Sequence, residues 1–328
     1  MRVDGSSYTV TTTNNSGSGS LREAVGEAVA ASDAAASITF SFANPGQIIQ
    51  LTSGQLEVSS SSNIFINGSG VIIDGGGAGS SLFFVDSDST LTITDATLRN
   101  VYSENSPGCI DCFGQLTLNS VTMTGCSGNN GGAINLEINS QLTATNCFFA
   151  DNSALYTGGA VSSMGTMTLI DCTFEDNAAD NDGGAVWSEG LMSASGCSFS
   201  NNDAAQGYGG AIYAGANTNI FGCTLSFNTA YYDGGAIFVA TAFFISNSMT
   251  CFQNAAVRTP LLTNDPISAS LIHNTTQYNT TQHNTTQRKN STHPTHTTNH
   301  NKIQSNMEKV DVSAGITQHQ FLSCSSQR

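Results

Sequence analysis

The sequence has little charge, and positive charge is the scarcer of the two signs. Charged residues make up 10% of the 328 residues, against about a quarter in ordinary soluble domains. Between Glu23 and Val257 the only basic residue is Arg99, whereas Asp and Glu occur throughout. A nucleic-acid-binding surface needs Lys and Arg to replace the counterions of the phosphates, and anionic membranes attract basic residues for the same reason. We therefore expect no nucleic acid and no anionic membrane surface as a partner.

Long apolar runs are also missing. No segment reaches the roughly 18 apolar residues that a membrane-spanning helix requires, so no membrane insertion by this chain is expected. The first five residues, Met1-Arg2-Val3-Asp4-Gly5, show none of the apolar stretch of a signal peptide. Gly, Ser, Thr, Asn and Ala replace the missing charged residues. Such a composition favours short strands and tight turns over packed helices.

A glycine motif recurs at a nearly constant spacing. Each copy has two glycines, an alanine and Ile or Val, and the next copy follows 25 to 27 residues later. The five glycine pairs are Gly131 and Gly132, Gly158 and Gly159, Gly183 and Gly184, Gly209 and Gly210, and Gly234 and Gly235. Self-similarity at such a period is typical of solenoid folds.

A second motif, Cys-x-Phe/Leu-x-x-Asn-x-Ala, recurs with the same period. Its cysteines are Cys147, Cys172, Cys197 and Cys223, and its asparagines are Asn152, Asn177, Asn202 and Asn228. A third, alternating element lies between the two motifs, as in Leu116-Thr117-Leu118. Three short strands per period, separated by turns rich in Gly and Asn, describe one coil of a parallel β-helix.

Stacking explains why the motifs stay in phase. Successive coils of a β-helix lie about 4.8 Å apart, so equivalent residues form columns along the axis. Inward apolar columns build a continuous core, and stacked Asn side chains can bond to one another. The leucine-rich repeat has a similar period, but its Leu-x-x-Leu-x-Leu unit is absent here. We predict an all-β fold, a right-handed single-stranded parallel β-helix of the pectate-lyase-like solenoid type.

Three regions are predicted. Residues 1–37 form an opening strand and a capping helix, because Ser20 and Glu23 make a capping box ahead of apolar residues at helical spacing. Residues 38–257 form the β-helix. Residues 258–328 form a low-complexity, disordered tail containing a five-residue polar repeat. The tail carries possible glycosylation sites at Asn274, Asn279, Asn284 and Asn290, although a spurious repeat from simple-sequence DNA is a competing explanation.

The two motifs resemble the repeats of the chlamydial polymorphic outer-membrane proteins (Pmp). They also resemble the wider set of right-handed β-helix proteins of microbial and algal surfaces. Gly-Gly-Ala-Ile occurs verbatim at Gly131, Gly209 and Gly234, and Phe-x-x-Asn runs from Phe149 to Asn152 and recurs twice more. The resemblance covers roughly residues 8 to 255. It implies an exported, extracellular or cell-surface protein concerned with adhesion, surface display or the envelope.

The β-helix fold also carries pectin lyases and hydrolases, so the fold alone does not decide the function. Lyase chemistry needs a basic residue and an acidic Ca²⁺ site, and hydrolysis needs two facing carboxylates. Arg99 is the only basic candidate in the β-helix. The candidate carboxylates are Asp151, Asp176, Asp180, Asp182, Asp203 and Asp233. Asp151 and Asp176 precede motif asparagines, and Asp182 and Asp233 precede glycine pairs, so these residues could form an acidic edge that holds Ca²⁺ or a cationic partner. Asp and Asn also favour turn conformations, and we prefer that explanation.

Cysteines and aromatic residues supply the remaining candidates. The four motif cysteines are expected to form a buried apolar column and not a zinc site or a disulfide chain. An oxidising compartment would permit a bridge from Cys109 to Cys112 or from Cys112 to Cys126. Trp187 and the pair Tyr231-Tyr232 are candidates for a sugar-binding face, or are simply isolated exposed aromatics. No catalytic residue, metal ligand or cofactor is predicted.

The function that these features favour is a non-enzymatic β-helix protein of the extracellular space or cell surface. Glycans or cell-surface proteins are its expected partners. The alternative is a pectin-class polysaccharide lyase or hydrolase on the same scaffold.

Overall fold

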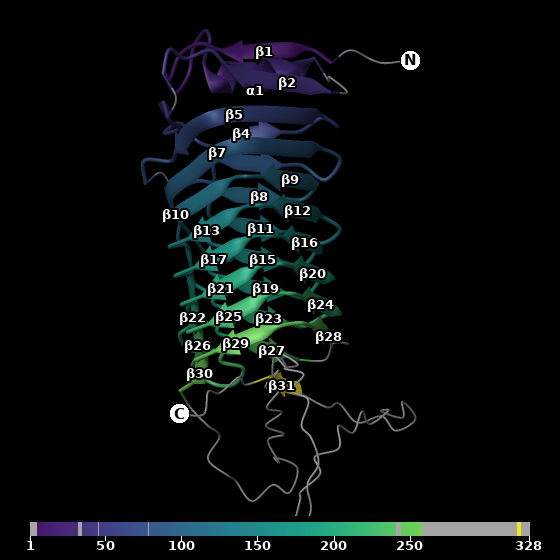
Figure 1. Ribbon diagram of the computed structural model, residues 1–328. Helices are drawn as coiled ribbons and strands as arrows, with labels where there is room; N and C mark the ends of the chain where they lie inside the picture. Colours follow the sequence, from purple (N-terminus) through teal and green to yellow (C-terminus); the bar gives the residue numbers. More distant parts are fainter. Residues whose placement is uncertain are drawn as a thin grey trace, which may run out of the picture. The chain divides into compact units, whose positions relative to one another are not determined.

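The computed structural model describes residues 5–31, 35–44, 46–77, 79–240, 244–257 and 320–322. Within these residues, short strands stack coil upon coil into a parallel β-helix (Figure 1). One turn of the chain about the axis is called a coil, and residues at equivalent positions in successive coils are called a column. The strands form two sheets, A and B, whose inner faces enclose the core.

Sheet B has one three-residue strand per coil. Its parallel strands are β4 (Leu56–Val58), β6 (Phe83–Val85), β8 (Ile110–Cys112), β11 (Ile134–Leu136), β15 (Val161–Ser163), β19 (Val186–Ser188), β23 (Ile212–Ala214) and β27 (Ile237–Val239). The strand β31 (Gln320–Leu322) pairs with β27 in the antiparallel direction. The register follows the sequence repeat, since Ile134 pairs with Val161 and Val161 with Val186.

Sheet A receives two segments from most coils, separated by a turn. The first strands, β1 (Ser7–Val10), β2 (Ala36–Phe40) and β3 (Ile48–Gln50), are followed by the long strands β5 (Asn63–Asp74) and β7 (Thr90–Tyr102). The first segments are then β9 (Gln115–Asn119), β12 (Gln141–Thr145), β16 (Thr166–Ile170), β20 (Met192–Ser195), β24 (Thr218–Phe221) and β28 (Phe244–Asn247). The second segments are β10 (Thr122–Gly128), β13 (Phe148–Ala150), β14 (Ser153–Ala154), β17 (Thr173–Glu175), β18 (Ala178–Ala179), β21 (Ser198–Ser200), β22 (Asp203–Ala204), β25 (Thr224–Ser226), β26 (Thr229–Ala230), β29 (Thr250–Phe252) and β30 (Ala255–Ala256).

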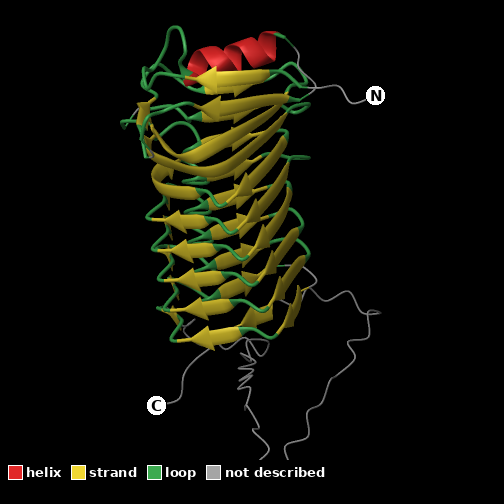
Figure 2. Ribbon diagram, turned by 45° about the horizontal axis from the view of Figure 1, so that its top comes forward, coloured by secondary structure: helices red, strands yellow, loops and turns green. Residues whose placement is uncertain are grey.

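The helix α1 (Leu21–Ala30) lies over the end of the coil stack, as Figure 2 shows. Ser20 is its N-cap and accepts the backbone N–H of Glu23 at 3.2 Å. The Glu23 carboxylate reaches back to the N–H of Gly19, one residue before the cap, at 2.5 Å. Leu21 and Val25 are among the helix residues buried against the stack. The predicted cap is confirmed, and it covers the apolar core that the first coil would otherwise expose.

The asparagine column runs inside the turn that divides the second segment of sheet A into two strands, such as β17 and β18. Asn177 shows its bonding: the side-chain amide donates to Oδ1 of Asn202 and to the carbonyl of Phe149, each at 3.0 Å. Its own Oδ1 accepts the N–H and the side-chain amide of Asn152. The motif asparagines are all buried, and each repeats this pattern in its own coil.

The apolar columns are equally regular. The rings of Phe149, Phe174 and Phe199 stack with centroid separations of 4.7 and 4.8 Å and interplanar angles of 5° and 6°. Such separations equal the distance between paired strands. The motif phenylalanines therefore lie directly over one another in a fully buried column.

The glycine pairs meet two different requirements. The first glycine has a positive φ, +67° in Gly183, which L side chains rarely adopt. The second has no room for a side chain, because a Cβ on Gly184 would lie 2.2 Å from the carbonyl oxygen of Gly210. Each coil therefore needs both glycines to turn tightly and to let the next coil approach.

No helix in the described ranges is long and apolar enough to cross a membrane. The predicted tail, residues 258–328, lies outside the described residues except for β31. The same holds for the four glycosylation candidates, Asn274, Asn279, Asn284 and Asn290, which stay predictions.

Candidate functional surface

The outer face of sheet B gathers the residues that best fit a binding surface. Each of its parallel strands places the first and third side chains in the core and the second outside, as in Val186, Trp187 and Ser188. The outward column changes character along the stack. It reads Glu57, Phe84, Asp111, Asn135, Ser162, Trp187, Tyr213 and Phe238. The coils nearer the C-terminus therefore carry three aromatic residues in succession.

These three belong to a continuous chain of six rings, here called the aromatic strip. Trp187 stacks on Tyr213 with centroids 6.2 Å apart, and Tyr213 stacks on Phe238 at 5.3 Å. Phe238 contacts Tyr208 at 4.5 Å. Tyr208 then stacks on Tyr232 at 5.0 Å, and Tyr232 meets Tyr231 edge-on at 4.9 Å. The strip spans three coils and is partly accessible, because only Phe238 is classed as buried.

Three residues of the strip were candidates from the sequence, and the structure brings them together. Trp187, Tyr231 and Tyr232 are joined through Tyr208, Tyr213 and Phe238, which the sequence analysis did not select. The sequence did contain a signal for Tyr213 and Phe238. Trp187, Tyr213 and Phe238 each follow Gly-Gly-Ala-Val or Gly-Gly-Ala-Ile directly, so the repeat itself places them in one column.

Carboxylates border the aromatic strip on one side. The residue before each glycine pair forms a column that contains Asp182, Tyr208 and Asp233 in consecutive coils, linked through the backbone. Asp182 accepts the N–H of Tyr208 at 2.8 Å. Burial raises the pKa of Asp182 and of Asp233. The pKa of Tyr208 is raised first by burial and then by the nearby negative charge of Asp233.

Glu189 borders the strip on the other side. It follows β19 by one residue and occupies the column of Gly215 in the next coil. Its carboxyl carbon lies 2.4 Å from where a Cβ on Gly215 would be, so the carboxylate rests over that glycine. The pKa of Tyr213 is raised by burial, then by the charges of Glu189 and Asp182. Tyr213 is therefore flanked by a carboxylate on each side.

A polar cluster lies on the same face at β8 and β11. Asn135 donates its side-chain amide to Asp111 at 3.0 Å and to Glu137 at 3.1 Å. Burial raises the pKa of Asp111, and the charge of Glu137 adds to this effect. One buried amide thus holds two carboxylates close to each other on the outer surface of the β-helix.

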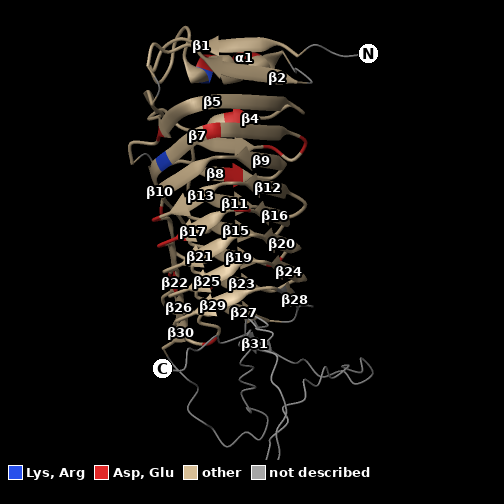
Figure 3. Ribbon diagram, in the orientation of Figure 1, with Lys and Arg blue, Asp and Glu red and all other residues tan. Residues whose placement is uncertain are grey.

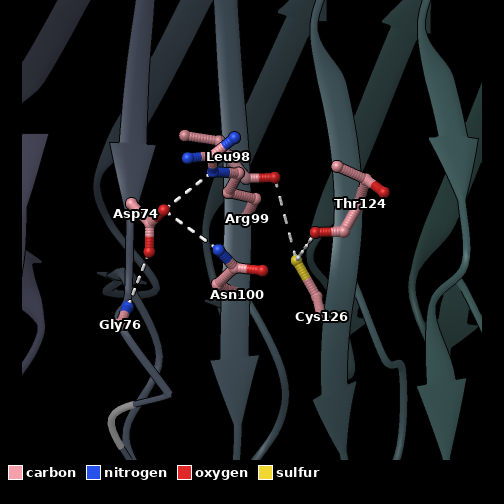
Figure 4. Close-up of polar contacts among 7 residues, drawn as sticks. All are labelled: Asp74, Gly76, Leu98, Arg99, Asn100, Thr124 and Cys126. Atoms are coloured by element: carbon pink, nitrogen blue, oxygen red, sulfur yellow. Dashed lines mark hydrogen bonds and ion pairs between the residues drawn. The ribbon is translucent and has the colours of Figure 1, made fainter. Parts of the chain in front are cut away.

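Arg99 lies away from this face, at the end of β7 in sheet A. Its Nε donates to Oδ2 of Asp74 at 2.7 Å, and Asn100 donates to the same oxygen at 3.0 Å (Figure 4). The other oxygen of Asp74 accepts the N–H of Gly76. Burial acts to raise the pKa of Asp74, but the bonds from Arg99, Gly76 and Asn100 outweigh it and hold the pKa below its ordinary value. Arg99 forms the only ion pair among the described residues.

The remaining carboxylate candidates occupy several places. Asp151 and Asp176 have φ of +54°, and Asn201 in the same column has +55°. The preferred explanation, turn chemistry, is confirmed for both, because Asp and Asn tolerate this conformation better than most residues. Asp203 accepts the hydroxyl of Thr229 in the next coil. Asp180 lies exposed after β18.

Four of the cysteines form a column, and two others form a bridge. Cys147, Cys172, Cys197 and Cys223 are free and buried in one column, and no group of metal-ligating side chains large enough to hold a metal ion occurs in the described ranges. Neither disulfide considered from the sequence is correct. Cys109 is bonded to Cys126, and Cys112 is a free, buried thiol whose pKa burial raises to about 12.

Register explains this correction. Cys126 pairs with Val101, and its N–H donates to Oδ1 of Asn152 at 3.1 Å, so it occupies the asparagine column one coil early. Cys109 precedes Ile110 and occupies the column of the motif alanines. The asparagine column and the alanine column are close enough for this disulfide. Cys112 lies at the C-terminal end of β8, and its side chain is buried in the core.

A family comparison agrees with this geometry. The model of the right-handed β-helix region matches residues 81–249 of the sequence. The chain belongs to this family. A search of curated proteins found no match. The family assignment establishes that the coils of this β-helix are right-handed. It specifies no chemistry, which follows from the individual residues.

The sheet B face of this β-helix can do two things chemically. Aromatic rings offer apolar surface and π-electrons, while the bordering carboxylates accept hydrogen bonds and attract cations. The charge map in Figure 3 shows how few basic positions accompany the acidic ones. A ligand on this face would therefore meet aromatic rings in the centre and negative charge at both borders.

Proposed function

We propose that this β-helix is a non-enzymatic protein of the extracellular space or cell surface that binds glycan chains on the outer face of sheet B. The observation that carries the proposal is the aromatic strip. Six rings in unbroken contact lie on one part of the outer face of sheet B. Aromatic side chains with polar tips are enriched at binding surfaces because they combine large apolar area with hydrogen bonding.

The proposed location has separate support. The Gly-Gly-Ala-Ile and Phe-x-x-Asn motifs resemble those of the Pmp repeats, which implies surface display or adhesion. The bridge between Cys109 and Cys126 is typical of proteins that fold in oxidising compartments. The sequons of the tail, at Asn274 and three further positions, suit a secreted chain.

The position of Arg99 favours a binding role over lyase chemistry. A lyase needs a basic group that is free to remove a proton from the sugar. The Arg99 guanidinium is held by Asp74, and it belongs to sheet A, whereas the column of Trp187, Tyr213 and Phe238 belongs to sheet B. Anionic pectin would also be repelled by the carboxylates at Asp182, Glu189 and Asp233.

One observation keeps hydrolysis as a second candidate. A glycosidase needs one carboxyl group that stays protonated and a second that is ionised. Asp111, with its raised pKa, and Glu137 share the amide of Asn135 on the same face as the aromatic strip. If this is the reaction centre, the full chain will release reducing ends from a neutral glycan, and Asp111→Asn will abolish the release.

The binding proposal is tested with the full chain on a panel of immobilised glycans. The variant W187A/Y213A removes two rings of the strip. The control Phe221→Ala removes a ring that is 50% exposed at the end of β24 on sheet A. We expect at least one glycan to bind, with tenfold or greater loss in W187A/Y213A and no loss in the control. Equal binding by all three proteins, or no binding to any glycan, would overturn the proposal.

A further inference from the structure

The borders of the aromatic strip restrict the kind of glycan that fits. On one side, Asp182 and Asp233 stand in the column of Tyr208. On the other side, the carboxylate of Glu189 rests over Gly215. The three carboxylates contribute negative charge to both edges of a ligand path that crosses Tyr213.

Among the residues that the structure describes, no basic side chain pairs with these carboxylates. Arg99 is the only basic residue between Glu23 and Val257, and it is already paired with Asp74. No ion pair to Asp182, Glu189 or Asp233 occurs in the part of the chain that the structure describes. Asp182 and Asp233 are partly buried, and partly buried carboxylates without a cation are electrostatically unfavourable. Burial raises the pKa of both accordingly. A cation supplied by a ligand would relieve this cost.

The rings beside the carboxylates suit the same ligand. An ammonium group over the face of Trp or Tyr gains cation–π attraction, which grows when the site is shielded from water. Trp187, Tyr213 and Tyr208 are all partly accessible. Tyr208 lies near Asp182 and Asp233, Tyr213 lies near Asp182 and Glu189, and Trp187 stacks on Tyr213. Acidic sugars would meet the same carboxylates as like charges.

From this charge pattern we infer that the glycan is a polymer of amino sugars with free amino groups, which lies across Tyr213 between Asp182 and Glu189. The inference rests on the proposed function and names the class of ligand for that surface. The sugar rings contact the aromatic strip, and their ammonium groups pair with the bordering carboxylates. Neutral and acidic glycans lack the second interaction.

The test compares four oligomers on the full chain by isothermal titration calorimetry, near pH 6 so that amines are protonated and most carboxylates ionised. The probes are a glucosamine oligomer, the N-acetylglucosamine oligomer of equal length, a galacturonate oligomer and a lysine oligomer. We expect the glucosamine oligomer to bind at least tenfold more tightly than its acetylated counterpart. Added salt should reduce this preference, because exposed charges are screened.

Two charge variants locate the effect. D182N/E189Q removes two carboxylates beside Tyr213, and the preference for the glucosamine oligomer should fall below about threefold. The control D171N/E175Q removes two charges from sheet A, and Asn at position 171 keeps the turn, whose φ is +51°. The control should retain the preference. Thermal unfolding of both variants shows whether each is folded.

The outcomes separate this inference from the proposed function. If the acetylated or galacturonate oligomer binds as tightly as the glucosamine oligomer, the ligand class is wrong and glycan binding stands. If the lysine oligomer binds at least as tightly as the glucosamine oligomer, the surface recognises cationic peptides and the inference is overturned. If no oligomer binds, both proposals fail. A preference that survives in D182N/E189Q also contradicts the inference.

Discussion

Asn152 and Asn177 are 25 residues apart in the sequence, and their side chains share a hydrogen bond of 3.0 Å deep in the protein. Each Asn donates the same hydrogen bond to the Asn of the next coil. Each also accepts a backbone N–H and donates to a backbone carbonyl. The column thus satisfies the hydrogen-bonding groups of a turn that is buried away from water. Because the bond joins equivalent residues of neighbouring coils, it also fixes how each coil is aligned with the next.

Replacing one member of this column should be costly. Asn177→Ala leaves the N–H of Asn152 and the carbonyl of Phe149 buried without these partners. An unsatisfied buried polar group costs about 1–3 kcal/mol, so we expect a loss of about 3 kcal/mol in the free energy of unfolding. Urea denaturation followed by circular dichroism measures it. The exposed Asn219→Ala on sheet A is the control, and a similar loss there would contradict the explanation.

Two glycine-to-alanine substitutions should have opposite signs. In Gly184→Ala the new Cβ would lie 2.2 Å from the carbonyl oxygen of Gly210, so the coils must separate and the protein should be strongly destabilised. Gly26 is exposed in α1 with no atom near its Cβ position. Gly26→Ala should therefore stabilise by about 0.5–1 kcal/mol through helix propensity. Thermal melts of the two variants decide this, and a shift in the same direction for both would refute it.

Removing the bridge between Cys109 and Cys126 should destabilise the protein. The two cysteines are 17 residues apart, and a loop of about 15 residues is worth about 3 kcal/mol in the loop-entropy treatment. We expect C109S/C126S to lose about that much in denaturant titration, and peptide mass mapping should find the bridge in the parent. The control Cys172→Ser leaves the bridge intact. A peptide map that joins Cys112 to either partner would contradict the structure.

The cysteines also show where sequence reasoning succeeds and where it stops. The period placed Cys147, Cys172, Cys197 and Cys223 in one buried column, because copies in phase must stack. The same reasoning was not extended to Cys126, which lies in a degenerate copy of the second motif, Val121-x-Met123-x-x-Cys126, 26 residues before Asn152. The period therefore already placed Cys126 in the asparagine column, and its pairing with Val101 agrees. The contact between Cys126 and Cys109 is what the period does not specify, because the two cysteines belong to different columns.

The aromatic strip was likewise only partly predictable from the sequence. Trp187, Tyr213 and Phe238 share a column that the repeat encodes. Tyr208 lies in a different column, and its contact with Phe238 joins neighbouring coils through side-chain orientation. No repeat specifies side-chain orientation, so the sequence could indicate single aromatic candidates but not their continuity.

The stability of the parent should depend on pH through Asp182. Burial raises its pKa in the folded state, so the folded protein holds this proton more tightly than the unfolded chain. The carboxyl therefore destabilises the fold above its folded pKa, and the cost disappears as the pH falls below the ordinary Asp value of about 3.9. Asp182→Asn should stabilise the protein at pH 7, and the gain should vanish near pH 3. A gain that is constant across this range would exclude ionisation as the cause.

The pair of Asp74 and Arg99 should show the opposite pH dependence. The pKa of Asp74 is lowered overall, so its charged form stabilises the fold above the ordinary pKa of Asp, and this contribution is lost as the pH falls through the folded value. Arg99→Met leaves the carboxylate, whose side chain is 5% exposed, without its cation. Breaking a buried pair from one side costs about 3 kcal/mol at neutral pH.

The double variant D74N/R99M removes the unpaired charge and should recover most of that loss. Urea titrations of the parent and both variants at pH 7 and near pH 3 measure it, with the difference between parent and Arg99→Met shrinking at the lower pH. A double variant as unstable as Arg99→Met would mean that the guanidinium acts through its packing and not through its charge.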